Sequence, residues 1–120
     1  MSERRKFPRI EKSLSIKLSD NEFDILTETK NISANGAYCP VRQPLPLMTK
    51  LDVVLLIPVA KNRSRAIKKL HCKGVVVRQE EARDNGTYSW RVAIYFNEIK
   101  ETDRKMLAAY VDSFQSSLEA

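Results

Sequence analysis

The chain has 120 residues, and its 21 Lys and Arg residues against 15 Asp and Glu residues give a formal charge of +6. A chain of this length buries roughly two-thirds of the surface exposed when unfolded, so one domain can form without disulfides or metals. Its 42 % hydrophobic and 30 % charged residues exclude disordered, collagen-like and coiled-coil classes. No apolar run approaches the roughly 20 residues that a bilayer requires, and no secretory signal follows the basic start. We therefore expect a cytoplasmic protein without membrane insertion.

Apolar and polar residues alternate through most of the chain, which is the pattern of half-buried β-strands. Asn35 and Gly36 give a strong hairpin-turn signal, because glycine adopts positive φ without steric cost. Pro40 is expected to end a short strand, and the segment around Pro44 and Pro46 is expected to form an extended connection. The alternation predicts six strands, at residues 14–18, 23–32, 37–39, 51–57, 67–78 and 87–96.

The apolar spacing becomes helical after the last predicted strand. We predict a helix over about residues 100–118, with Thr102 and Asp103 as cap and first-turn acid. Its apolar stripe is expected to pack on the sheet. The predicted fold is therefore all-β with a terminal helix: a six-stranded antiparallel β-barrel of the split-barrel type followed by a C-terminal α-helix. Residues 13–120 would form this single domain, and residues 1–12 a basic arm.

The chain offers no constellation for catalysis or metal binding. Cys39 and Cys72 belong to no CxxC motif or Cys/His cluster, so we interpret them as core residues. His71 is the one histidine, and in a strand it would point away from its neighbour Cys72. Without an HExxH motif, a P-loop or a second histidine, the sequence predicts no enzyme, no metal site and no cofactor.

The basic charge is concentrated in two segments. Residues 1–12 carry a net charge of +3 and residues 61–83 carry +6, whereas the rest of the chain is weakly acidic. Both segments favour an anionic partner. The start of the second segment also fits a solvated hairpin loop, in which lysine and arginine discourage edge-to-edge aggregation.

The arm contains an RxxxR motif. Pro8 disfavours the helical conformation for Phe7, so we expect an extended arm that is flexible without ligand because few apolar anchors offset its ordering entropy. In an extended arm Arg5 and Arg9 project to the same side, roughly 13 Å apart, which fits an anion with two lobes. Arginine binds phosphate or the O6/N7 edge of guanine through two parallel hydrogen bonds. The motif alone also fits an arm that is basic for solubility.

A second polar motif covers residues 31–36. If the strand continues through Ser33, then Asn31 and Ser33 share one face while Ile32 points into the core. Two small hydrogen-bonding side chains beside a turn at Gly36 could bind the polar edge of a ligand. The same residues also fit an ordinary hairpin.

Taken together, these two motifs resemble those of the PilZ domain family, bacterial receptors for cyclic di-GMP. The family pairs an RxxxR arm with a (D/N)xSxxG segment on a six-stranded antiparallel barrel followed by a helix, and the resemblance covers nearly the whole chain. One departure is Ala93, where the family commonly has glycine. The matching residues are Arg5 and Arg9 for the first motif and Asn31, Ser33 and Gly36 for the second.

The resemblance implies that the arginines close over the guanine edge and phosphates of cyclic di-GMP, while Asn31 and Ser33 contact its second guanine region and Gly36 shapes the turn beneath. Arg4, directly before the motif, implies two stacked, intercalated ligand molecules. Arg78 is a further candidate for a secondary contact. The implied function is a receptor that orders its arm on binding and acts through an unidentified effector protein, in motility, surface polysaccharide or biofilm control.

Two alternatives stay open at this point. A basic β-barrel could bind single-stranded nucleic acid, but Tyr88 and Trp90 would face away from Tyr95, so the last strand forms no single stacking stripe and the sequence disfavours this function. The chain could also be a PilZ-like module that assembles with proteins without a ligand, which the matched motif residues disfavour.

Overall fold

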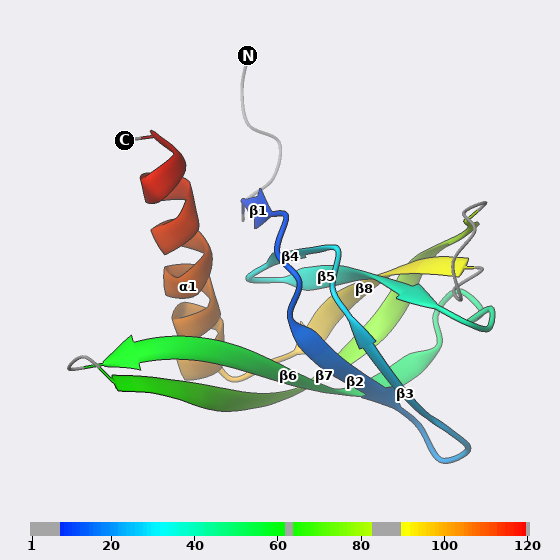
Figure 1. The fold of residues 1–120 in the computed structure, drawn as a ribbon. Coiled ribbons are helices and arrows are strands. Elements are labelled where there is room, and N and C mark those ends of the chain that lie inside the picture. Colours follow the sequence, from blue (N-terminus) through cyan, green and yellow to red (C-terminus); the bar gives the residue numbers. More distant parts are fainter. Residues whose placement is uncertain (1–7, 62–63, 83–89, 120) are drawn as a thin grey trace.

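The computed structural model describes residues 8–61, 64–82 and 90–119, and contains eight strands and one helix (Figure 1). Among these residues, no helix has the length and apolar character needed to cross a bilayer. The elements are β1 (Arg9–Ile10), β2 (Ser15–Ser19), β3 (Asp24–Glu28), β4 (Asn31–Ser33), β5 (Gly36–Val41), β6 (Lys50–Lys61), β7 (Ser64–Glu81), β8 (Trp90–Glu98) and α1 (Glu101–Glu119).

All eight strands belong to one antiparallel sheet, in the order β1-β4-β5-β8-β7-β6-β2-β3. The sheet curls into a half-barrel, because β3 at one end of this order approaches β5, and the Thr27 hydroxyl donates to the Pro40 carbonyl at 2.7 Å. The helix stands at one end of the sheet beside β1 (Figure 1). The predicted all-β architecture with a C-terminal helix is confirmed, but the number of strands is eight rather than six.

One additional strand lies within the segment predicted as the arm. Arg9 pairs with Ser33, and Ile10 pairs with Ile32, so β1 adds to the edge of β4. Ile10 is 7 % exposed and belongs to the hydrophobic core. Burial of this side chain offsets the entropy of ordering the strand.

The other additional strand arises because the predicted strand 23–32 is two strands, β3 and β4. The buried Thr29 separates them. Its hydroxyl donates to the Lys12 carbonyl at 2.6 Å and accepts from the Leu14 N–H at 2.9 Å. The Thr29 N–H also donates to the Leu14 carbonyl at 2.9 Å, so the chain stays attached to the link between β1 and β2, but the Leu14 N–H binds the Thr29 hydroxyl.

Pro40 does not end its strand, because β5 continues to Val41. A proline cannot donate a ladder hydrogen bond, so strands accept it where that donor has no partner. The pairing of β4 with β5 stops at Tyr38. Pro40 therefore pairs on one side, with Arg91 of β8, and has no β4 residue on the other side. The prediction overlooked that β5 is locally an edge strand here.

The core fills the inside of the curled sheet and extends under α1. The presence of α1 confirms the helix predicted over residues 100–118. Among the helix side chains that the structure describes, residues 101–114, Leu107 and Val111 are buried. Cys39 and Cys72 are buried free cysteines, as predicted, and burial raises the pKa of each thiol to about 12. Both thiols are therefore protonated, unreactive core groups at neutral pH.

The connection between β5 and β6 contains a strained turn. Met48 has a φ of 70°, a left-handed conformation that side chains with a Cβ rarely adopt. Its N–H donates to the Val76 carbonyl at 2.7 Å, and the Val76 N–H donates to the Thr49 carbonyl at 3.0 Å. The turn is therefore attached to β7 by two backbone hydrogen bonds.

We expect Met48→Val to lower the free energy of unfolding by about 1–2 kcal/mol, because a β-branched side chain is strained further in the left-handed region. Met48→Gly relieves this strain, so its stability should equal or exceed that of the wild type within about 1 kcal/mol. Met48 is 70 % exposed, and neither variant loses much buried area. Urea unfolding measures both effects, and equal stability of the two variants would contradict the prediction.

Candidate functional site

The strand registers align the outward-facing residues of the sheet into rows. In the first row, Arg9 of β1 lies opposite Ser33 of β4, which lies opposite Gly36 of β5. These residues come from the two sequence motifs, and we call them the motif row. Arg9 is exposed, whereas its neighbour Ile10 points into the core. The pairing of β1 with β4 therefore brings the end of the RxxxR motif beside the NxSxxG motif.

The second row crosses four strands. Asn31 of β4 lies opposite Tyr38 of β5, Tyr38 lies opposite Ala93 of β8, and Ala93 lies opposite Arg78 of β7. We call these four residues the tyrosine row. It adjoins the motif row, so the structure brings Arg9, Asn31, Ser33, Gly36 and Arg78 onto one outer face. Arg4 and Arg5 lie outside the described residues.

The Ser33 side chain forms hydrogen bonds within the turn that follows it. Its side chain is buried at 1 % exposure, and its hydroxyl donates to the Asn35 carboxamide oxygen at 2.7 Å. The Asn35 N–H donates to the same hydroxyl at 3.3 Å. Ser33 and Asn31 share the outer face, as predicted, while Ile32 is fully buried. In this structure the serine shapes the turn, and its contact with a ligand stays a prediction.

Gly36 is required for a reason other than the predicted one. The turn consists of Ala34 and Asn35, and Gly36 begins β5 without positive φ. A Cβ at Gly36 would lie 2.5 Å from the Ile94 carbonyl oxygen of β8, closer than such atoms approach. Glycine therefore permits close approach of the two backbones. The expected positive φ was wrong, and the place of Gly36 in a binding site stays a prediction.

Tyr38 and Glu80 are surface residues of this face that sequence reasoning missed. The Tyr38 hydroxyl donates to the Glu80 carboxylate, and the Arg78 guanidinium lies over the Tyr38 ring at 5.5 Å from its centroid. Partial burial raises the pKa of Tyr38, and the hydrogen bond and negative charge of Glu80 raise it further. Arg91 lowers this pKa and offsets part of the increase. The phenol is therefore neutral and remains a donor. The alternating pattern of β5 places Tyr38 outward, and that was the available signal.

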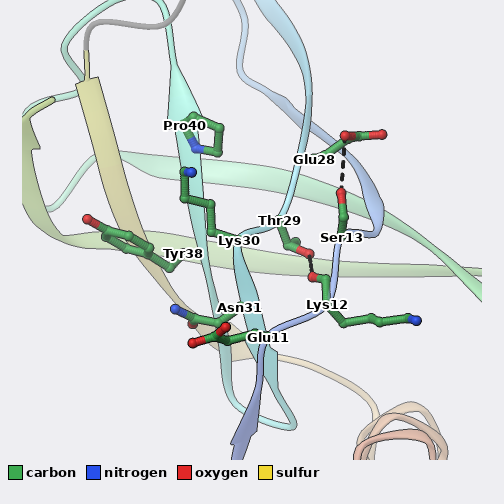
Figure 2. Close-up of a pocket in the computed structure, with 9 residues that line it drawn as sticks. All are labelled: Glu11, Lys12, Ser13, Glu28, Thr29, Lys30, Asn31, Tyr38 and Pro40. Carbon is green, nitrogen blue, oxygen red and sulfur yellow. Dashed lines mark hydrogen bonds between the residues drawn. The ribbon is translucent and has the colours of Figure 1, made fainter. Parts of the chain in front are cut away.

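A pocket of about 620 Å³ opens beside the tyrosine row (Figure 2). This size lies within the range of small-molecule sites. The Asn31 carboxamide oxygen is buried and has no hydrogen-bond donor within the part of the chain that the structure describes. An acceptor in this state favours a ligand that supplies an N–H group. The pocket is lined by Glu11, Lys12, Ser13, Glu28, Thr29, Lys30, Asn31, Tyr38 and Pro40.

The aromatic residues of β8 do not form a stacking surface for nucleic acid within its described residues. Tyr95 is 45 % exposed on the outer face. Trp90 packs against the core from the other face, and Tyr88 lies outside the described residues. This agrees with the opposite orientations that the sequence predicts for Trp90 and Tyr95.

The fold and this face define a small β-domain whose outer face gathers polar and cationic side chains from its strands, as a candidate site. The family model of the PilZ domain matches residues 3–113. The chain therefore belongs to the PilZ domain family, which confirms the resemblance seen in the sequence.

Several solved structures share the fold. The inhibitor of motility MotI/DgrA from Bacillus subtilis matches with a TM-score of 0.83 and 20 % identity, over 97 % of this chain and 53 % of that chain. The PilZ domain of YcgR from Escherichia coli with c-di-GMP matches with a TM-score of 0.64 and 11 % identity, over 97 % of this chain and 95 % of that chain. A longer YcgR complex with c-di-GMP has a TM-score of 0.71 and 12 % identity, over 97 % of this chain and 48 % of that chain.

At such identities the likeness shows the fold alone. The chain spans about half the length of the MotI chain and of the longer YcgR chain. No curated protein sequence matches it.

Proposed function

We propose that the chain is a cytoplasmic receptor for cyclic di-GMP that acts by binding rather than by catalysis. The observation that carries this proposal is the pairing of β1 with β4, which places Arg9 opposite Ser33 and joins the two motifs on one face. Family membership and the YcgR structures with c-di-GMP support the same ligand. An outer face that gathers arginines suits a dinucleotide with two phosphates.

In the proposed complex, Arg5 and Arg9 close over the ligand and bind its guanine edge and phosphates. The Asn31 carboxamide oxygen, which has no donor in the described structure, accepts from the N–H groups of the other guanine. Ser33 holds the turn beside it, and Arg78 supplies a secondary contact from β7.

The proposed signal runs from the arm to the helix. Strand β1 contacts both β4 and α1, and the Lys12 ammonium lies 4.6 Å from the centroid of the Phe114 ring of α1. Phe114 also contacts Tyr110 edge-on, at 5.0 Å between ring centroids. A ligand that binds Arg9 would order the arm and change the surface formed by the arm and the helix, which an effector protein then recognises. MotI is an inhibitor of motility, and motility is the process we favour for that effector over biofilm control.

Isothermal titration with cyclic di-GMP tests this proposal. We expect micromolar binding, equivalent to about −8 kcal/mol, because charge-assisted bonds from several arginines act together. Two ligands per chain are expected, since Arg4 adds a third guanidinium that can stack on a base and offset the added phosphates. Cyclic GMP and a single-stranded oligonucleotide are the controls. Saturation at one ligand contradicts the intercalated pair, and absence of binding overturns the receptor proposal.

A further inference from the structure

The Tyr38 ring is fixed in place on the outer face of the sheet. Its hydroxyl is bound by Glu80, and its ring is covered by the Arg78 guanidinium at 5.5 Å, within the range of a cation–π contact. These contacts lie on the side of the sheet opposite the buried residues Ala37 and Cys39. The arrangement therefore orders a surface aromatic side chain without adding to the core.

Arg78 reaches the ring because β7 is bulged. The register between β7 and β8 shifts between Val76 and Arg78, and Val77 is the extra residue. Val76 is fully buried and Val77 is 50 % exposed, so the bulge turns Arg78 to the outer face. The strained Met48 turn binds Val76 by its backbone and supports this bulge. Strain kept by surrounding structure is typical of functional sites.

Ala93 lies between Tyr38 and Arg78 in the tyrosine row. Its methyl side chain leaves room for the guanidinium to extend across β8 toward the ring. Asn31 lies opposite Tyr38 from the β4 side, and both line the pocket in Figure 2. The pocket is thus lined by the Tyr38 ring and by Asn31, whose buried carboxamide oxygen has no donor in the described structure. These two groups together suit a planar base with N–H donors on its edge.

We infer that Tyr38 is a base-stacking residue of this site, whose ring packs against a guanine base while Asn31 accepts from the edge of that base. This inference rests on the proposed function and identifies which side chain holds the base. Stacking of a nucleobase on an aromatic side chain contributes substantially to binding affinity. It accepts any base, because every base has a π-face. Glu80 and Arg78 hold the ring before the ligand arrives, which reduces the entropy lost on binding.

Titration of Tyr38→Leu and Tyr38→Phe with cyclic di-GMP tests this inference. We expect Tyr38→Leu to weaken binding by about 5- to 150-fold, the range that corresponds to loss of one stacked base. Tyr38→Phe keeps the ring and its contact with Arg78 but loses the hydrogen bond to Glu80, so it should weaken binding by about two- to threefold, less than Tyr38→Leu does. Ile67→Ala removes an exposed apolar side chain of β7 that lies opposite Pro58, outside both rows, and this control should bind as the wild type does.

Tyr38→Trp gives a readout independent of affinity. The chain has one tryptophan, Trp90, which packs against the core, so fluorescence added at residue 38 reports on the site. We expect cyclic di-GMP to quench this added fluorescence and to leave that of the wild type nearly unchanged. Equal affinities of Tyr38→Leu and the wild type, or unquenched fluorescence of a ligand-saturated Tyr38→Trp, would overturn the stacking inference. If the wild type itself binds no ligand, the proposed function fails instead.

Discussion

Arg5→Ala and Arg9→Ala are each expected to weaken binding of cyclic di-GMP by about 30- to 1,000-fold and to leave the fold intact. Each removes a charge-assisted contact with phosphate or guanine, which corresponds to about 2–4 kcal/mol of binding free energy. Arg9 has an exposed side chain, and β1 is held by backbone pairing and by the buried Ile10. Removal of the guanidinium therefore changes the site without removing the strand.

The matched control for the arginine variants is Arg65→Ala. This exposed arginine lies on β7 near the turn from β6, so the substitution makes the same change in net charge far along the chain from both motifs. Isothermal titration gives the dissociation constants, and thermal unfolding verifies that all three variants are folded. Unchanged affinity in both arm variants, or an equal loss in Arg65→Ala, would refute specific binding by the arm.

Gly36→Ala is expected to lower the free energy of unfolding by about 1–3 kcal/mol and to weaken ligand binding at the same time. The added Cβ would lie 2.5 Å from the Ile94 carbonyl oxygen, and a backbone atom in a sheet cannot move aside without displacing its strand. Displacement of β5 from β8 moves Tyr38 and the turn at Asn35, which both belong to the proposed site. Urea unfolding and titration measure the two effects.

Gly74→Ala is the control that separates the loss of stability from the loss of ligand binding. A Cβ at Gly74 would lie 2.6 Å from the Ile94 Cγ2 atom, so this variant should also lose stability through overpacking of the same residue. Gly74 lies in β7 opposite Leu51, outside the two rows of the site, and its folded form should bind ligand with wild-type affinity. A stable Gly36→Ala with full affinity would show that the close approach of β5 and β8 is not needed.

Local patterns in the sequence determined the class of fold and the motif residues. Alternation with period two predicted the strands, and the change to helical spacing after Phe96 predicted α1, because both signals depend on neighbours in the chain. The two motifs identified the family, and their residues lie on one outer face where the structure describes them. The strands and the helix follow from spacing, whereas the family follows from the resemblance of the two motifs.

The tertiary structure decided which residues share a site. Arg78 has the same parity as the buried Val76 and would point inward in a regular strand, but the bulge at Val77 turns it onto the Tyr38 ring. A bulge depends on the partner strand, and so does the pairing of β1 with β4. Gly36 likewise owes its role to the Ile94 carbonyl of β8, distant along the chain. Contacts between distant segments leave no periodic signal, because backbone pairing is set by the packing of the whole sheet.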